Sequence, residues 1–147
     1  MTNIHLARPE DADRLLAMVA ACHDELGIRQ SDADRAAALA PLLDGSPHGV
    51  AYMIGPVRAP IGYTVISFGW SLAYGGLAGQ VQDIWIRPGV RRRGIGTEVL
   101  YALPKALAQA GLCALSAAAP PATPTEIFFR RARFANHDDS VVMTLRL

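Results

Sequence analysis

The sequence has few of the residues that build disulfides or metal sites. Of its 147 residues only two are cysteines, Cys22 and Cys113, which lie too far apart for a CxxC pair or a metal-ligand spacing. We interpret each as a small core residue in preference to a nucleophile or half of a disulfide. The four histidines are scattered through the chain, so no metal site is expected.

An excess of charge of one sign is also lacking. The formal net charge is +1, and Lys105 is the lone lysine among the basic residues. A balanced chain has no overall field that steers it to nucleic acid or to a membrane surface. No apolar run is long enough to span a bilayer, and the N-terminal letters MTNIHLARPEDAD lack the layout of a signal peptide. We therefore expect a cytoplasmic protein with no nucleic-acid or membrane partner.

The sequence does contain alternating strand-like and helix-like segments, with the composition of an ordinary globular protein. No break in composition marks a linker, so we expect a single domain over residues 1–147. The order β-α-α-β-β-β-α-β-α-β predicts an α/β fold, a mixed sheet with helices on both faces. The predicted strands are residues 4–8, 50–57, 61–68, 80–86, 112–117 and 140–147, and the predicted helices are residues 9–26, 31–43, 94–110 and 124–133.

The stretch RPGVRRRGIGTEVL, residues 87–100, joins a strand to a helix through an arginine-rich glycine loop. Gly94 and Gly96 allow a tight turn and keep side chains away from the helix N-terminus, where free N–H groups favour an anion. Arginines add charge-assisted hydrogen bonds, so the loop suits a pyrophosphate. It is not a Walker loop, because no Gly-Lys-Ser/Thr follows, and it is not GxGxxG, because Val99 stands where a third glycine would be. The alternatives are a solvated basic turn and, less favoured, a nucleic-acid patch.

The segment IWIRPGVRRRGIGTEVL resembles the central motif of the GNAT superfamily of acetyl-CoA-dependent N-acyltransferases. That motif is an apolar strand, then Arg-Pro, then Arg/Gln-x-x-Gly-x-Gly/Ala, then a helix. Arg91, Gly94 and Gly96 fill the last pattern in register, and Arg87 and Pro88 form the preceding turn. IHLARPEDADRLLAMV is similar to the family's first strand and helix, IFFRRARFA to its late helix, and VVMTLRL to its last strand. The resemblance therefore covers the whole chain.

The resemblance implies a set of residues that bind acetyl-CoA. The strand before the loop would hold the pantetheine arm and the acetyl carbonyl through main-chain groups, while the strand at residues 112–117 splays away to leave a slot. Phe129 would pack against the arm. The implied cofactor-binding residues are Ile84, Trp85, Ile86, Arg91, Arg92, Arg93, Gly94, Ile95, Gly96, Thr97 and Phe129.

Acetyl transfer to an amine needs a deprotonated amine and a polarised thioester carbonyl. Asp83 is the only acid on the central strand, so it is the candidate base, with a structural hydrogen-bonding role as the alternative. VQDIWIRP is similar to the LEDLYVRP of diamine and polyamine acetyltransferases in the family. Gln82 replaces their glutamate, which weakens the case for a polyamine substrate.

The leaving thiolate also needs a proton, and here the chain departs from the family. Phe129 stands where many members have a tyrosine. Tyr74, Tyr101 or Ser116 could serve instead, or solvent could protonate a thiolate whose pKa is about 8.5. The third alternative is a protein that binds acetyl-CoA without transferring the acetyl group. Trp70, in the loop with Tyr74, belongs to an aromatic wall for the substrate or to the core.

The function expected from the resemblance is transfer of an acetyl group from acetyl-CoA to a primary amine of a small molecule, by direct attack in a ternary complex. The alternatives are a non-catalytic acyl-CoA-binding or regulatory module and a protein or peptide acetyltransferase. Cys113 as an acyl carrier is less favoured, because nothing near it in sequence would lower its pKa. The apolar VVMTLRL permits a homodimer through the last strand.

Overall fold

The computed structural model describes residues 2–136 and 140–147 and contains a five-stranded sheet in the order β1-β2-β3-β4-β5. The first four strands are antiparallel, and β5 pairs parallel with β4, so the expected mixed sheet is confirmed. In chain order the elements are β1 (Ile4–Leu6), the short turn η1 (Pro9–Asp11), α1 (Ala12–Leu26), α2 (Asp32–Leu43), β2 (Gly49–Ile54), β3 (Gly62–Ser71), β4 (Gly76–Ile86), η2 (Pro88–Val90), α3 (Ile95–Gln109), β5 (Ala114–Ala117) and α4 (Pro124–Arg131).

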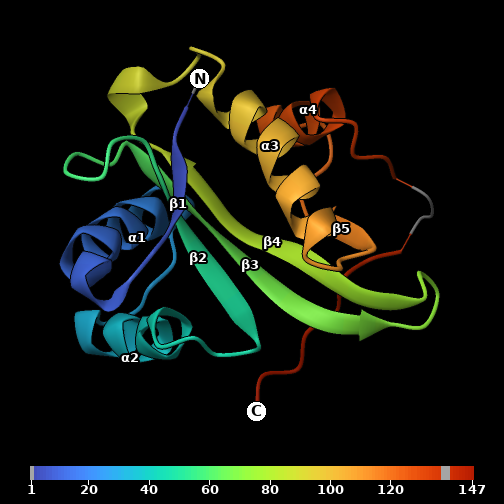
Figure 1. The fold of residues 1–147 in the computed structure, drawn as a ribbon, viewed down its shortest axis with the longest axis horizontal. Helices are drawn as coiled ribbons and strands as arrows, with labels where there is room; N and C mark the ends of the chain where they lie inside the picture. The colour runs from blue at the N-terminus through green and yellow to red at the C-terminus, as the bar shows by residue number, and fades with distance from the viewer. Residues whose placement is uncertain (1, 137–139) are drawn as a thin grey trace.

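Helices cover both faces of the sheet, as Figure 1 shows. Helices α1 and α2 pack on one face, where α1 buries Leu15, Met18, Val19 and Cys22. Helices α3 and α4 pack on the other face in a second cluster. The sheet therefore separates two hydrophobic cores. Successive side chains along each strand point alternately into one core and into the other. In the part of the chain described, no helix combines the length and hydrophobicity needed to cross a membrane.

The helix ends follow local sequence signals. Helix α1 ends at Gly27, whose φ of 69° lies in the left-handed region that glycine favours. Helix α2 begins at Ser31, whose Oγ accepts a hydrogen bond from the amide of Asp34 at 3.1 Å. Thr123 caps α4 in the same way, as its sequence predicts. The Glu126 carboxylate completes that cap by accepting from the amide of Ala122, one residue earlier than a standard capping box.

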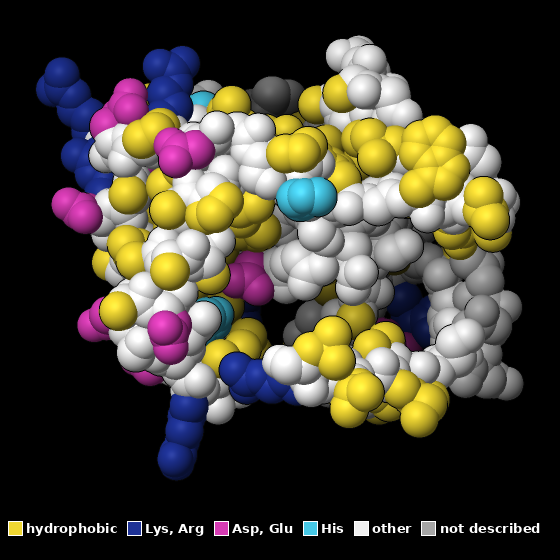
Figure 2. All heavy atoms as spheres, turned by 90° about the horizontal axis from the view of Figure 1, so that it is seen from below, with side chains coloured by type: hydrophobic (Ala, Val, Ile, Leu, Met, Phe, Trp, Pro, Cys, Tyr) yellow, Lys and Arg dark blue, Asp and Glu magenta, His cyan; other side chains and the backbone are white. Residues whose placement is uncertain are grey.

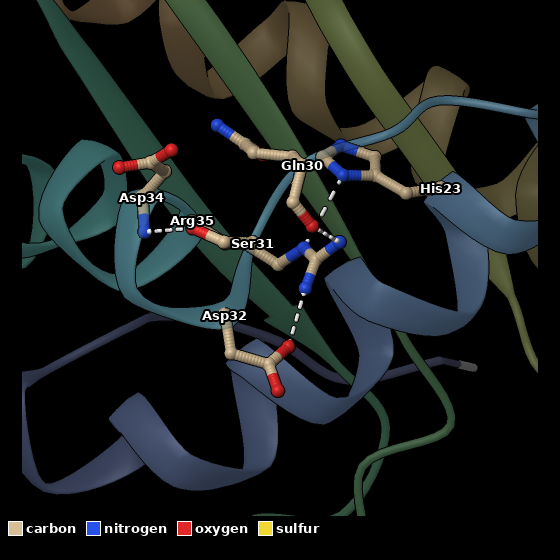
Figure 3. Close-up of polar contacts among 6 residues, drawn as sticks. All are labelled: His23, Gln30, Ser31, Asp32, Asp34 and Arg35. Atoms are coloured by element: carbon tan, nitrogen blue, oxygen red, sulfur yellow. Dashed lines mark hydrogen bonds and ion pairs between the residues drawn. The ribbon is translucent and has the colours of Figure 1, made fainter.

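A buried arginine holds the connection between α1 and α2. Arg35 is 7% exposed, and its Nε donates to Nδ1 of His23 at 3.3 Å. One Nη donates to the Asp32 carboxylate at 2.7 Å and the other to the carbonyl of Gln30 at 3.1 Å. Figure 3 shows the guanidinium pointing at these three acceptors from α2. The side chain thus ties α2 to the last turn of α1 and to the loop between them.

Two expectations about the fold are wrong. Residues 140–147 form no strand, and the exposed fractions of Val141, Val142, Met143, Leu145 and Leu147 run from 77% to 111%. An alternating apolar pattern favours a strand only where a neighbouring strand and a covering layer are present. Cys113 is exposed rather than in the core, because it precedes β5 at the margin of the sheet, where its Sγ donates to the carbonyl of Leu77. Cys22 is buried, as expected.

Candidate active site

A bulge in β4 is the first feature of the site. Val65 of β3 pairs with Asp83, but its neighbour Ile66 pairs with Val81, so Gln82 is an extra residue on β4. The bulge resets the alternation of the strand. From Asp83 onward, each side chain therefore lies on the opposite face of the sheet from the one that uninterrupted alternation along β4 would give. The sequence carries no signal for this bulge.

Beyond the bulge β5 no longer accompanies β4. Pairing between the two strands ends at Val81, which lies opposite Ala117, and the rest of β4 pairs with β3 alone. The amide of Arg87 donates to the carbonyl of Ile61 at 2.7 Å, on the β3 side. Since main-chain groups alternate in an antiparallel ladder, those of Ile84 point toward the space that β5 leaves. All four residues of β5 pair with β4, so the opening, called the split below, begins where β5 ends and not where a paired strand splays away.

The three strand residues predicted to bind the cofactor through main-chain groups therefore differ in where those groups point. Only Ile84 has both its N–H and its C=O directed into the split without a partner among the described residues. The carbonyl of Ile86 accepts a hydrogen bond from Nε of Arg91 at 2.7 Å. Trp85 turns its peptide groups toward β3 and its side chain into the core below α1.

The glycine loop presents a row of free amides next to the split. The amide of Arg91 donates to Pro88, and that of Glu98 donates to Gly94. Between them the amides of residues 92–97 have no acceptor in the described part of the chain. Arg92 and Gly94 have φ values of 63° and 77°, and such left-handed residues curve a loop so that successive N–H groups converge. With the start of α3 adjacent, the loop is suited to bind an anion.

The two glycines of this loop are needed for different reasons. Gly94 has a positive φ and open space around it, so the requirement is conformational. A Cβ on Gly96 would lie 2.9 Å from the ring of Phe128, so the requirement there is space for α4. Phe128 in turn stacks on Phe129, which is 7% exposed and packs in the core between α3 and α4. Phe129, the residue predicted to pack against the pantetheine arm, thus supports the glycine loop through its contact with Phe128.

The Arg91 side chain points to α1. One of its Nη atoms lies 2.8 and 2.9 Å from the two carboxylate oxygens of Glu25, and the guanidinium lies 5.9 Å from the centre of the Trp85 ring. The indole of Trp85 also donates to Glu25, at 2.9 Å. These hydrogen bonds, first that of Trp85 and then that of Arg91, hold the pKa of Glu25 below its usual range. Arg92 and Arg93 are exposed and make no ion pair with any described residue.

Asp83 lies on the α1 face of the sheet and is held by a buried tyrosine. The Tyr63 hydroxyl donates to Oδ2 of Asp83 at 2.8 Å, and the Thr64 hydroxyl donates to the Asp83 carbonyl at 2.8 Å. Burial and the charge of Asp83 raise the pKa of Tyr63, so the phenol remains a donor. Oδ1 of Asp83 has no partner among the residues described, and it is the atom free to accept a proton.

The other candidate side chains fall into two places. Tyr101 lies on the outer face of α3 beneath Lys105, 65% exposed and away from the split. Trp70, Tyr74 and Ser116 instead line one cavity of about 280 Å³ near the β3–β4 turn. Trp70 and Tyr74 are 73% and 55% exposed, so neither of them lies in the core. Sequence analysis missed Glu25 and Tyr63, whose partners are 66 and 20 residues away.

This geometry defines a class of protein, an α/β domain whose split sheet lies beside a cradle of amides for a phosphate-bearing ligand. A family model described as acetyltransferase (GNAT) family matches residues 13–133. The chain belongs to the GNAT acetyltransferases, a family whose acetyl donor is acetyl-CoA, and the predicted family and enzyme class are confirmed. No curated protein sequence matches the chain.

Solved structures share the fold at low sequence identity. An integron cassette protein from the mobile metagenome of Cole Harbour Salt Marsh is 24% identical with a TM-score of 0.84, over 98% of this chain and 90% of that one. A predicted acetyltransferase from Clostridium acetobutylicum, solved with acetyl-CoA, is 16% identical with a TM-score of 0.78, over 98% and 96%. The aminoglycoside N-acetyltransferase AAC(6')-Iy, solved with CoA, is 14% identical with a TM-score of 0.81, over 100% and 96%.

Proposed function

We propose that the protein transfers an acetyl group from acetyl-CoA to a primary amine of a small molecule, by direct attack in a ternary complex. The observation that carries the proposal is the row of unpartnered amides at residues 92–97, directly beside the split between β4 and β5. A diphosphate and a long thioester arm are the two parts of acetyl-CoA that such a cradle and slot would hold. Arg92 and Arg93 then serve the cofactor and not a nucleic acid.

The chain's own residues supply the remaining steps. The thioester of acetyl-CoA provides an activated acetyl group when the donor is bound. The main-chain N–H of Ile84 is placed to donate to the acetyl oxygen and stabilise the charge that develops there. Asp83, fixed by Tyr63, accepts the proton of the amine through its free Oδ1. Phe129 offers no proton, so we assign protonation of the thiolate to solvent or to a hydroxyl at the split.

The comparisons support a small-molecule substrate. AAC(6')-Iy has also been solved with the bisubstrate analogue CoA-S-monomethyl-acetylneamine, at 13% identity to this chain and a TM-score of 0.80. That analogue combines both substrates in one molecule, and its binding to AAC(6')-Iy agrees with attack in a ternary complex. We also propose a cytoplasmic location, where acetyl-CoA is available to the enzyme.

The test is calorimetric titration with acetyl-CoA, followed by initial rates on a panel of amines. Thr97→Glu introduces a carboxylate among the free amides and should weaken acetyl-CoA binding by at least about tenfold, because the anion and the carboxylate repel. Ala38→Glu, an exposed change of the same charge on α2, is the control and should bind as the parent does. Substitution of Gly96 is less informative, because its Cβ would displace Phe128.

Three outcomes would contradict the proposal. No binding of acetyl-CoA by the parent would remove the donor. Binding without turnover on any amine would favour the non-catalytic acyl-CoA-binding module instead, for which the absent hydroxyl at Phe129 is the supporting feature. Acetylation of proteins in a lysate but of no free amine would favour a protein acetyltransferase.

A further inference from the structure

Polar side chains gather on the part of the sheet that α1 and α2 do not cover. Ser67 of β3 pairs with Gln80 of β4, and Gln80 pairs with Ser116 of β5, so the three side chains lie in a row across one face. Alternation along β3 places Ser67 on the same face as Tyr63. The polar row therefore lies on the same face of the sheet as the Asp83 carboxylate, which accepts its hydrogen bond from Tyr63 there.

This row forms the floor of the cavity of about 280 Å³. None of its lining residues carries a charge, and two of them are exposed aromatics, Trp70 at 73% and Tyr74 at 55%. The volume is at the low end for ligand pockets, so it suits one ring-sized substrate better than a peptide. Figure 2 shows that the molecule is hollowed on its lower side, with hydrophobic side chains along the margins of the hollow.

The hydrogen-bonding groups of the floor are available to a ligand. The side chains of Gln80 and Ser116 make no hydrogen bond with any described residue. The next glutamine on the strand, Gln82, is engaged, because its amide donates to Oγ of Ser67 at 2.8 Å. The cavity therefore offers hydroxyl and amide groups of both donor and acceptor character.

The cavity lies on the same face of the sheet as the candidate base. Gln80 and Asp83 pair with Ser67 and Val65, which are two residues apart on β3, or about 7 Å along a strand. The bulge at Gln82 lies between them. A substrate whose amine meets Asp83 would place its body, one ring away, over Gln80 and Ser116. The only negative charge it would meet in this arrangement is at the amine end.

We propose that this cavity selects the acceptor, and that the acceptor is a hydroxylated monoamine of the amino-sugar type. The ring hydroxyls bind Gln80 and Ser116. A diamine would leave the floor's polar groups unpaired and would find no carboxylate for its second ammonium among the lining residues. The assignment rests on the proposed acetyltransferase function and deepens it by naming the class of acceptor.

Binding of three matched amines in the presence of CoA tests the assignment without turnover. Glucosamine carries the amine and the hydroxyls, cyclohexylamine has the ring without hydroxyls, and 1,4-diaminobutane has a second cation. Tryptophan fluorescence reports binding, because Trp70 is exposed while Trp85 is 6% exposed. Glucosamine should bind at least about tenfold more tightly than either of the others. Equal or tighter binding of cyclohexylamine or 1,4-diaminobutane would overturn the proposal.

Substitutions locate the effect in the cavity. Gln80→Ala and Ser116→Ala should each raise KM for glucosamine about five- to tenfold and leave KM for acetyl-CoA unchanged. Gln109→Ala, at the exposed end of α3 and outside the cavity, is the matched control and should change neither. An unchanged KM for glucosamine in both cavity variants would refute the assignment. The two proposals can fail separately. Turnover without a preference for glucosamine would refute only the amino-sugar assignment, whereas absence of acetyl-CoA binding would refute the proposed acetyltransferase function.

Discussion

At the scale of single residues, the least expected finding is the role of Glu25. It lies at the C-terminal end of α1, yet it accepts hydrogen bonds from Trp85 on the central strand and from Arg91 in the cofactor loop. Arg91 also donates to the strand carbonyl of Ile86. One carboxylate thus connects α1, β4 and the loop, and fixes the direction in which the loop begins.

Glu25→Gln tests this connection. The variant keeps an acceptor for one donor but loses the charge that faces Arg91, and it should lower the free energy of unfolding by about 1 kcal/mol, as for a partly exposed pair with good geometry. Asp24→Asn, the neighbouring exposed residue on the same helix, is the control. Urea denaturation of the parent and both variants gives the values. A difference no larger than that of Asp24→Asn would show that the pair contributes nothing.

The same variant has a defined pH dependence. Because the hydrogen bonds lower the pKa of Glu25 in the folded state, its contribution is complete above the unfolded pKa of about 4.3. The contribution is lost as the pH falls through the lowered folded value. The stability gap between the parent and Glu25→Gln should therefore be constant at neutral pH and close in acid.

At the scale of elements, the helices begin and end where local signals place them, but their mutual placement depends on a few long side chains. Arg35 is the clearest case, since α1 and α2 are joined by a loop that has no regular structure of its own. Its guanidinium supplies the donors for the loop carbonyl of Gln30 and for His23. The two helices would otherwise have only their apolar contact on the sheet.

Arg35→Met should destabilise the protein by about 2 kcal/mol, because it removes three hydrogen bonds from the connection between α1 and α2 while it keeps most of the apolar stem. Amide hydrogen exchange in residues 27–31 should become faster at the same time. Arg29→Met, an exposed arginine in the same loop, serves as the control and should change neither quantity. Faster exchange in both variants alike would argue that the loop opens independently of Arg35.

At the scale of the whole molecule, the sheet ends at β5 and the C-terminal segment lies away from it. Among the described residues β5 pairs only with β4, so its outer edge has unpaired main-chain groups. Residues 140–147 meanwhile expose five large apolar side chains. An open edge and an apolar segment of strand-like pattern are complementary, and joining them between two copies would bury both.

We therefore expect a homodimer that depends on the C-terminal segment. Light scattering should show a dimer for the full chain at micromolar concentration and a monomer for a variant that ends at residue 139. Near-native circular dichroism of the shortened chain would confirm that it is folded, since these residues contribute nothing to either core. A full chain that stays monomeric at all concentrations would contradict this prediction.

The sequence by itself determined the order of the elements as far as α4, the caps at Ser31 and Thr123, and the loop with Gly94 ahead of α3. These features depend on φ values and hydrogen bonds between residues a few positions apart, so a short stretch of letters is sufficient to predict them. The family motif also predicted the glycine loop as the cofactor site, because the spacing of the motif is local in the same way.

Only the tertiary structure decided which side chains complete the site. The bulge at Gln82, the link of Glu25 to Arg91 and the hydrogen bond of Tyr63 to Asp83 each depend on segments far apart in the chain. The same holds for residues 141–147, whose strand-like pattern forms no strand in the described part of the chain. A contact of this kind depends on the register of neighbouring strands and on how a helix packs over them, and no local pattern of residues specifies either.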